Sequence, residues 1–254
     1  MGLLEGKTAL VFGVANKRSI AWGITEAFLR EGATVGISYA AEALEKRVFP
    51  LAEENGIDFV DKCDVTSDEQ IAETFARAKE RFGTIDILVH AVAFGPKDDL
   101  GGRFRDVSRD GFKLALDITA YSLIPMAKHA AEMMPNGGSI MALSYYAAEK
   151  VLPRYNVMAI AKAALENCVR YLAVDLGPEG IRVNAISPGP MKTLAGAAIG
   201  GGRKTFRHAE SNAPLRQNAT LECIGGTAVY LASDHGACTT GEIIVVDGGY
   251  HVLG

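Results

Sequence analysis

The sequence predicts an α/β fold: a doubly wound parallel β-sheet with helices on both faces, built as a single domain over residues 1–254. Short apolar runs alternate with longer segments of helical periodicity, a pattern typical of parallel sheets covered by helices. A length of 254 residues suits one large α/β core, and no linker or internal repeat divides the chain.

The N-terminal half shows the clearer alternation. Its expected strands are short apolar runs, and its expected helices carry apolar residues with a period near 3.6. In chain order, beginning with a strand, these segments are Thr8–Phe12, Ile20–Arg30, Thr34–Ser38, Glu42–Glu54, Asp58–Cys63, Asp68–Arg81 and Ile85–His90.

The C-terminal half continues the pattern, with helices expected at Ala120–Met134 and Asn156–Leu176. Strands are expected at Ser139–Leu143, Arg182–Ser187 and Ile243–Val246. Ligands of such sheets bind beyond the carboxyl ends of the strands, so functional residues are sought in the loops that follow them. The Gly/Ala-rich run at residues 195–202 has few large side chains. A mobile substrate-binding segment is therefore expected around residues 194–210.

Composition excludes several classes of protein. Hydrophobic residues make up 48% of the chain and charged residues 22%, which fits a folded globule rather than an extended disordered protein. The net charge of −4 gives no global attraction to nucleic acid or to an anionic membrane. No export signal or membrane span is evident, and the cysteines lack metal-ligand spacing, so we expect a cytoplasmic protein with reduced thiols and no bound metal.

A glycine turn follows the first expected strand and opens a helix, at residues 13–23. Gly13 permits a backbone conformation that other residues resist, and Ser19 can cap the helix. Free N–H groups near Ser19 and Ile20 can face the pyrophosphate of a dinucleotide. The turn lacks regular G-x-G-x-x-G spacing, so a plain strand–helix turn is the alternative.

Further nucleotide contacts are expected after later strands. Asp64 and Val65 close the third expected strand, and Val92 follows the fourth, where adenine and the nearer ribose would lie. Helix capping by Asp64 and packing by Val92 are the alternatives. Met191 and Thr193 lie in a proline-stiffened loop after the sixth expected strand, whose backbone can hydrogen-bond a nicotinamide carboxamide, or which is simply a rigid turn.

Tyr155 and Lys162 form the candidate catalytic pair. Their spacing of seven residues places them two helical turns apart and only about 20° out of line. A buried lysine beside a tyrosine is expected to favour the phenolate, lowering a pKa that starts at about 10, and to ready the hydroxyl for a developing oxyanion.

Together these features resemble the short-chain dehydrogenase/reductase superfamily and, within it, the bacterial NADH-dependent enoyl-acyl-carrier-protein reductases. The resemblance covers essentially the whole chain and implies a Rossmann-like fold. The stretches that carry it are Gly13-Val14-Ala15-Asn16, Ser19-Ile20-Ala21, Ser144-Tyr145, Tyr155-Asn156-Val157-Met158 through Lys162, and Arg182-Val183-Asn184-Ala185-Ile186-Ser187.

Two positions set this chain apart from ordinary superfamily members. Those proteins place the tyrosine four residues before the lysine, where this chain has Met158, and a serine about thirteen residues earlier, where it has Tyr145. The reactive tyrosine is thus displaced by one helical turn, as in the enoyl reductases. Reduction of a double bond places the hydride three atoms from the thioester oxygen, and a displaced donor suits that geometry.

The resemblance implies hydride transfer from NADH to the β-carbon of a trans-2-enoyl thioester, with an enolate held by Tyr155. Lys162 would hold the nicotinamide ribose and contribute positive charge. Tyr145 would line the acyl site and assist, or only pack there, and Phe94 with Gly95 would border the thioester.

The implied substrate is enoyl-acyl carrier protein in type II fatty acid biosynthesis, and the implied assembly is a homotetramer. The alternatives are a short-chain ketoreductase acting on a carbonyl and a non-catalytic NAD(H)-sensing protein. NADH is expected to be preferred to NADPH because the segment after Ser38 offers no cation for a 2′-phosphate, although Lys46 and Arg47 follow on the next helix. A basic cluster of Arg203, Lys204 and Arg207 is expected to dock the acidic carrier protein, unless it is only a solvated helix face.

Overall fold

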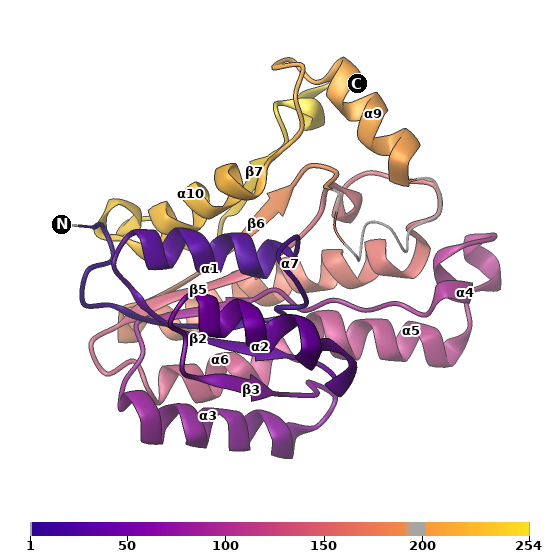
Figure 1. Cartoon of the computed structure of the whole chain (residues 1–254). Helices are drawn as coiled ribbons and strands as arrows, with labels where there is room; N and C mark the ends of the chain where they lie inside the picture. The colour runs from indigo at the N-terminus through magenta and orange to yellow at the C-terminus, as the bar shows by residue number, and fades with distance from the viewer. Residues whose placement is uncertain (1, 192, 194–201, 254) are drawn as a thin grey trace.

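The computed structural model describes residues 2–191, 193 and 202–253, which form one sheet with helices on both faces (Figure 1). Within these residues the sheet has seven strands in the order β3-β2-β1-β4-β5-β6-β7, and all neighbouring strands pair in parallel. The predicted parallel α/β fold is confirmed. The strands are β1 Thr8–Phe12, β2 Thr34–Tyr39, β3 Val60–Lys62, β4 Ile87–His90, β5 Gly138–Leu143, β6 Ile181–Pro188 and β7 Ile243–Val246.

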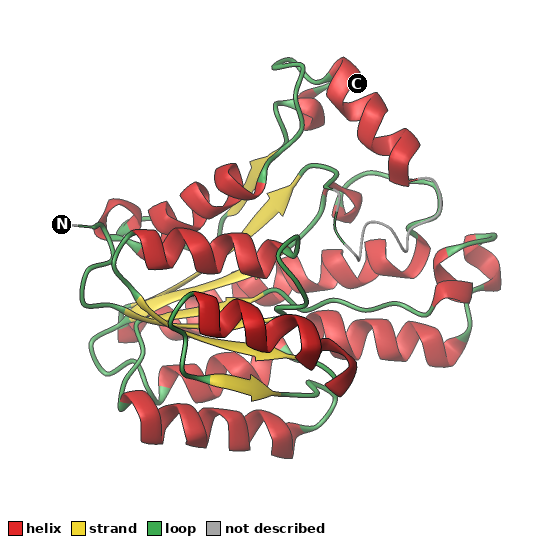
Figure 2. Ribbon diagram, viewed as in Figure 1, coloured by secondary structure: helices red, strands yellow, loops and turns green. Residues whose placement is uncertain are grey.

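The helices connect successive strands (Figure 2). Most of the predicted helices are present, but Ala120–Met134 is divided into a π-helical turn, Asp117–Tyr121, and a separate α6. The α-helices are α1 Ile20–Arg30, α2 Glu45–Glu54, α3 Asp68–Phe82, α4 Lys97–Leu100, α5 Arg109–Leu116, α6 Leu123–Ala131, α7 Asn156–Leu176, α9 Gly202–Asn212 and α10 Leu221–Ala232.

Alternate residues of the central strands enter two separate cores. In β1, Ala9 and Val11 pack with α1, α2 and α10, whereas Leu10 and Phe12 pack with α3, α6 and α7 on the opposite face. This division follows from the two-residue period of a strand, which sends successive side chains to opposite faces. Every strand near the middle of the sheet is therefore fixed from both sides.

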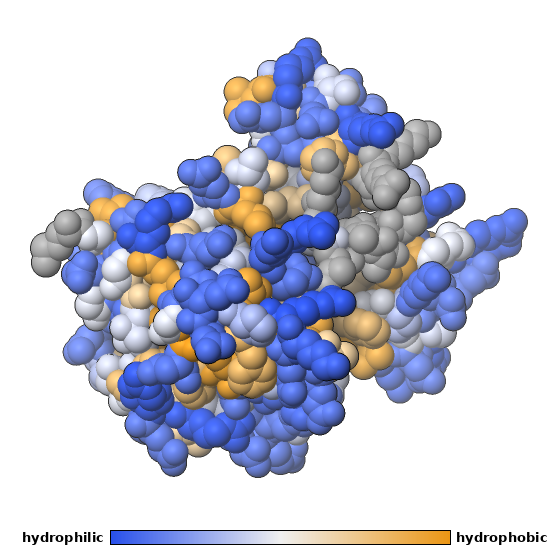
Figure 3. All heavy atoms as spheres, viewed as in Figure 1, coloured by the Kyte–Doolittle hydropathy of each residue, from blue (hydrophilic) through white to orange (hydrophobic). Residues whose placement is uncertain are grey.

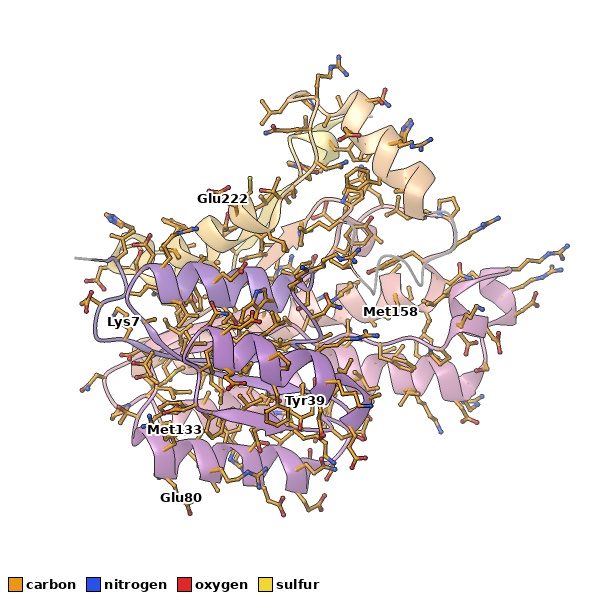
Figure 4. The ribbon with its side chains drawn as sticks, viewed as in Figure 1. Lys7, Tyr39, Glu80, Met133, Met158 and Glu222 are labelled. Carbon is orange, nitrogen blue, oxygen red and sulfur yellow. The ribbon has the colours of Figure 1, made fainter. Side chains whose placement is uncertain are left out.

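A third, smaller apolar cluster lies beyond the carboxyl ends of the strands. It contains Leu100 of α4, Ala115 of α5, and Val157 and Met158 of α7, together with Tyr155. Met158 belongs to the first turns of α7 (Figure 4). Because this cluster packs α4 and α5 against the start of α7, it fixes the surroundings of the candidate catalytic pair.

Several boundaries differ from the prediction. The third strand is only Val60–Lys62, shorter than the predicted Asp58–Cys63, and Asp64 and Val65 lie in the loop after it. Helices α4, α5 and α10 were not predicted. Of the segment expected to be mobile, residues 194–201 lie outside the described residues, and α9 covers the rest. Its mobility stays a prediction.

The face of the molecule in Figure 3 is mostly hydrophilic, with apolar residues scattered among polar ones. Among the helices that the structure describes, none is long and apolar enough to cross a membrane. The described residues also contain no group of three or more His, Cys, Asp or Glu side chains placed to hold a metal ion.

Candidate active site

A cavity of about 1130 Å³ opens at the carboxyl ends of β1, β4, β5 and β6, where the sequence predicted ligand binding. The strand order reverses at this point, because the chain continues from β3 at one edge to β4 beside β1. Predicted site residues that line the cavity are Gly13, Ser19, Ile20, Val92, Tyr145, Tyr155, Lys162, Met191 and Thr193.

Gly13 is required where the predicted nucleotide turn leaves β1. Its φ is +99°, and a Cβ atom at this position would lie 2.2 Å from the carbonyl oxygen of Ala91. The amides of Gly13 and Val14 both donate to the carbonyl of Ser38, each at 3.0 Å. The turn is therefore tied to the ends of β2 and β4 and leaves the close backbone approach that a dinucleotide pyrophosphate needs.

Ser19 differs from the prediction in how it is used. It is the N-cap residue of α1, but its side chain makes no capping hydrogen bond. Its hydroxyl instead donates to the carbonyl of Asn16 at 2.7 Å, and its N–H donates to the same carbonyl at 3.0 Å. Ser19 therefore closes the glycine turn, and the first-turn amides of α1 at Ile20 and Ala21 remain at the cavity wall for an anion.

Beyond the nucleotide turn, the part of the cavity expected to hold adenine is lined by Ala40, Leu44 and Arg47. Asp64 and Val65 do not line it. The Asp64 carboxylate accepts hydrogen bonds from the amide and hydroxyl of Thr66, at 3.0 and 2.8 Å. The early end of β3 explains the difference, since Asp64 has already turned away into a local loop. A nucleotide role for Asp64 and Val65 remains a prediction without support from the cavity.

Phe94 and Gly95 lie just beyond the cavity, whereas Ala91, Val92 and Ala93 line it. The Phe94 amide donates to Thr119 Oγ1 at 3.3 Å, and its side chain is 49% exposed. A Cβ atom on Gly95 would lie 3.0 Å from Met158. Both residues therefore border the region of Met158, and their contact with a thioester stays a prediction.

Tyr155 and Tyr145 meet inside the cavity. Their ring centroids are 4.9 Å apart, and Tyr155 is the N-cap residue of α7. Burial, helped by the nearby Tyr145, raises the pKa of the Tyr155 hydroxyl far above its usual value of about 10. The predicted lowering of this pKa was wrong, because the phenolate would be buried away from water beside Tyr145. Tyr155 is therefore a protonated hydrogen-bond donor.

Lys162 is buried and lines the same cavity. Its ammonium donates a hydrogen bond to the carbonyl of Leu143, the last residue of β5. Burial lowers the pKa of Lys162 to about 8, while the charge of Glu166 acts in the opposite direction. Lys162 is therefore still largely cationic at neutral pH.

The wall that faces the nucleotide turn was predicted only in part, as a substrate-binding segment around residues 194–210, and its individual residues were not named. Leu152 and Pro153 line the cavity from the loop before α7, and Thr205, Phe206 and Glu210 line it from α9. The basic cluster 203–207 is the sequence feature that marks α9, and it was predicted to dock the carrier protein rather than to line the cavity. Arg207 of that cluster lines the cavity itself.

A glycine turn at the point where the strand order reverses, and a buried Tyr–Lys pair in the same cavity, define a nucleotide-dependent oxidoreductase of the short-chain dehydrogenase/reductase class. Ordinary members of that class carry a tyrosine where this chain has Met158, so the particular family needed a comparison of the whole chain.

The comparisons agree with each other. The family model described as enoyl-(acyl carrier protein) reductase matches residues 13–251. A curated relative from Rhizobium meliloti (strain 1021), named enoyl-(acyl-carrier-protein) reductase (NADH) 1, is 51% identical over 253 residues, which cover 100% of this chain and 93% of the relative.

Two solved structures are similarly close. The reductase of Anaplasma phagocytophilum in complex with NAD has a TM-score of 0.96 and 49% identity, covering 100% of this chain and 97% of that one. The Bacillus cereus enzyme, solved with NADP+ and an indole naphthyridinone, has a TM-score of 0.97 and 48% identity, covering 100% of each chain. The chain belongs to the enoyl-acyl-carrier-protein reductase family. It is an NADH-dependent oxidoreductase of fatty acid biosynthesis, and its substrate is enoyl-acyl carrier protein.

Proposed function

We propose that Tyr155 and Lys162 carry out reduction of the 2,3 double bond of a trans-2-enoyl thioester in this cavity, with Tyr145 beside them. The observation that carries the proposal is the burial of Tyr155 against Tyr145, in one cavity with Lys162 and the nucleotide turn. The other predicted site residues that line the cavity position NADH and the enoyl thioester.

Bound NADH supplies the hydride that adds to the β-carbon of the substrate. As negative charge develops on the thioester oxygen, the Tyr155 hydroxyl donates a hydrogen bond to it, and a proton from solvent water then adds to the α-carbon of the enolate, leaving hydroxide in solvent. The raised pKa of Tyr155 suits this role because the proton stays on the hydroxyl. Lys162 holds the nicotinamide ribose and places a positive charge near the developing enolate.

Tyr145 has two candidate roles. It lines the acyl site, and its ring contacts that of Tyr155, so its hydroxyl is a candidate substitute donor should Tyr155 be lost. Burial raises the pKa of Tyr145 to about 12, so it too remains protonated. Phe94 and Gly95 are proposed to border the thioester from the side of Met158, and the segment around residues 194–210 to close over the acyl chain. We assign all of residues 1–254 to one catalytic domain.

Carbonyl reduction is the alternative function. The side chain of Met158 occupies the position of the usual ketoreductase tyrosine and contacts Thr119 Oγ1, at 3.9 Å from sulfur to oxygen. A thioether has no proton to give to an alkoxide, so this position cannot act as the acid of a ketoreductase.

One comparison separates these functions. NADH oxidation is measured with a trans-2-enoyl thioester and with a 3-ketoacyl thioester of equal chain length. We expect turnover with the enoyl substrate alone. Faster turnover of the ketoacyl substrate would favour the ketoreductase, and NADH binding without turnover of either would favour the NAD(H)-sensing protein.

We also propose a homotetramer. Apolar side chains are exposed along the outer faces of α6 and α7 and the turn before α6, which makes these helices candidates for subunit interfaces. The exposed fractions are 48% for Tyr121, 43% for Ile124, 38% for Ile160 and 80% for both Tyr171 and Val174. Sedimentation equilibrium should give the mass of four chains, and Val174→Glu should lower that mass.

We propose a cytoplasmic location because the cysteines form no disulfide bonds. Cys63, Cys168, Cys223 and Cys238 are all free, and Cys223 and Cys238 are exposed. Exposed unpaired thiols fit a reducing compartment, where NADH is also available.

A further inference from the structure

Glu166 is a buried carboxylate that the proposed mechanism does not use. It lies on α7 one turn after Lys162, is only 5% exposed, and does not line the cavity. Charged side chains are rarely buried to this degree without a partner, since removal from water costs several kcal/mol or more. The contacts of Glu166 therefore indicate what its burial achieves.

The closest contact of Glu166 is with Ser144, the first residue after β5. Ser144 Oγ donates to Glu166 Oε1 at 2.5 Å, and the Ser144 amide donates to the carbonyl of Ile186 at 2.8 Å. Ser144 stands between Leu143, whose carbonyl accepts from Lys162, and Tyr145. A single carboxylate thus holds the backbone segment that supports both Lys162 and Tyr145.

Charged and titratable groups surround Lys162 on several elements. His90 of β4 is buried, and its pKa is lowered to about 3 by burial and by Lys162, so it is neutral. Tyr155 and Tyr145 are also neutral, because burial raises the pKa of each. Glu166 lies one turn from Lys162 on the same helix, and its negative charge favours the cationic form of Lys162.

Two further charges act on Glu166 from outside. Arg170 Nη2 lies 3.7 Å from Glu166 Oε2, and Glu149 of the loop after β5 lies near enough to oppose ionisation of Glu166. Burial raises the pKa of Glu166, whereas Ser144, Arg170 and Lys162 each act to lower it.

We propose that Glu166 is a positioning residue of the reaction: it fixes the end of β5 through Ser144 and provides the counter-charge that keeps the buried Lys162 cationic. The proposal rests on the role of Lys162 given above. Glu166 thus has two separable effects, the clamp on β5 and the charge beside Lys162. A merely structural role would change neither the pH dependence nor the charge dependence of catalysis.

The test uses Glu166→Gln, which keeps the shape and an oxygen acceptor for Ser144 but removes the charge. The pH dependence of kcat/KM is measured with NADH and an enoyl thioester. Lys162 has a folded pKa below its ordinary value, and its cationic form is lost as pH rises through about 8. Removing the anion disfavours the cation further, so the alkaline limb should move to lower pH by about one unit.

Ser144→Ala is the complementary variant. It removes the clamp on β5 but leaves the carboxylate, so kcat should fall while the alkaline limb stays in place. Asp175→Asn is the matched control, because it removes an exposed carboxylate from the same helix. Asp175→Asn should match wild type in both kcat and pH profile.

If thermal unfolding shows that Glu166→Gln is not stably folded, Glu166→Asp is used instead. Aspartate keeps the charge but shortens the reach, so kcat should fall with the alkaline limb unmoved. An unmoved limb in Glu166→Gln, or wild-type kcat in Glu166→Asp, would overturn the inference. Lys162→Met distinguishes failure of the inference on Glu166 from failure of the proposed function. If Lys162→Met retained full activity, the proposed role of Lys162 itself would be wrong.

Discussion

Burial sets the chemistry of the residues in the cavity. It raises the pKa of Tyr155 and lowers the pKa of Lys162, and each shift favours the neutral form of the group. The consequences differ, because a neutral tyrosine is the useful hydrogen-bond donor, whereas a neutral lysine would lose its electrostatic role. The site therefore needs an anion close to the lysine and none close to the tyrosine.

Residue identity and spacing in the sequence were enough to predict that Gly13, Tyr155 and Lys162 would meet at one site, and all three line the cavity. The sign of the Tyr155 pKa shift was not accessible, because it depends on how completely the third apolar cluster and Tyr145 surround the hydroxyl. The end of β3 was predicted at Cys63 instead of Lys62 for a related reason. Where β3 ends depends on its pairing with β2, which ends at Tyr39 opposite Lys62.

At the residue scale, the position of Arg47 leads to a prediction about the choice between NADH and NADPH. It lines the cavity with Ala40 and Leu44, and it is the lining cation of the segment that follows β2, where a 2′-phosphate is expected. NADH should still be preferred, and Arg47→Ala should lower kcat/KM with NADPH about tenfold, as expected for one charge-assisted hydrogen bond, with little change for NADH.

Lys46→Ala is the control for Arg47→Ala, since Lys46 is exposed on the same helix and does not line the cavity. Both cofactors are titrated in steady-state assays of the three proteins. Equal losses of NADPH efficiency in the two variants would show that general charge, and not contact by Arg47, governs the effect. Equal efficiency of wild type with NADH and NADPH would contradict the predicted preference.

At the element scale, two helices pack unusually closely on one face of the sheet. A Cβ atom on Gly23 of α1 would lie 2.7 Å from Leu221 Cβ, and a Cβ atom on Gly225 of α10 would lie 2.7 Å from Ala27 Cβ. Small residues at both positions let the helix backbones approach. Helix α10 was not predicted because adjacent glycines weaken its helical signal, and packing against α1 overrides that weakness.

Gly225→Ala should therefore destabilise the protein. The added methyl group has no space between α10 and α1, and overpacking of this kind costs about 1 to 3 kcal/mol of unfolding free energy. Gly226→Ala is the matched control: among the described residues, and apart from the backbone of its own helix, no atom lies within 4 Å of a Cβ atom there. Alanine should stabilise the helix by up to about 1 kcal/mol. Denaturant unfolding of both variants measures the difference, and equal stabilities would contradict the packing assigned to α1 and α10.

At the scale of the whole molecule, the fold gathers distant segments at one edge of the sheet. The end of β1, the end of β5 and the start of α7 meet in the cavity because parallel strands present their carboxyl ends together. That rule made the cavity's position predictable from the strand pattern. The contribution of α9 was predicted only coarsely, as a substrate-binding segment around residues 194–210. The lining residues Thr205, Phe206 and Glu210 were not predicted individually, because no strand ends there and tertiary packing brings α9 over the site.

Carrier docking is also a property of the whole molecule. The net charge is −4, so an acidic carrier protein needs a local basic surface, and the cluster 203–207 lies on the helix that lines the cavity. Reversal of Arg203, Lys204 and Arg207 to Glu should lower kcat/KM for the carrier-linked substrate severalfold at low salt, and the loss should shrink as salt is added.

A short enoyl pantetheine thioester is the uncharged control, and a coenzyme A thioester is included for comparison. Because Arg207 lines the cavity, the control also reports any damage to the site itself. Equal losses for the carrier substrate and the pantetheine thioester would mean that the cluster supports the local fold, and the docking role would be dropped.

The most direct test of the catalytic account is Tyr155→Phe, assayed by NADH titration and by steady-state turnover of a trans-2-enoyl thioester. The variant keeps the ring contact with Tyr145 and loses only the hydroxyl. NADH affinity should be unchanged, and kcat should fall by roughly 100- to 1000-fold, the usual cost of one preorganised oxyanion donor, or by less where Tyr145 or water substitutes. Wild-type turnover in Tyr155→Phe would contradict the assignment of Tyr155 as the donor to the enolate.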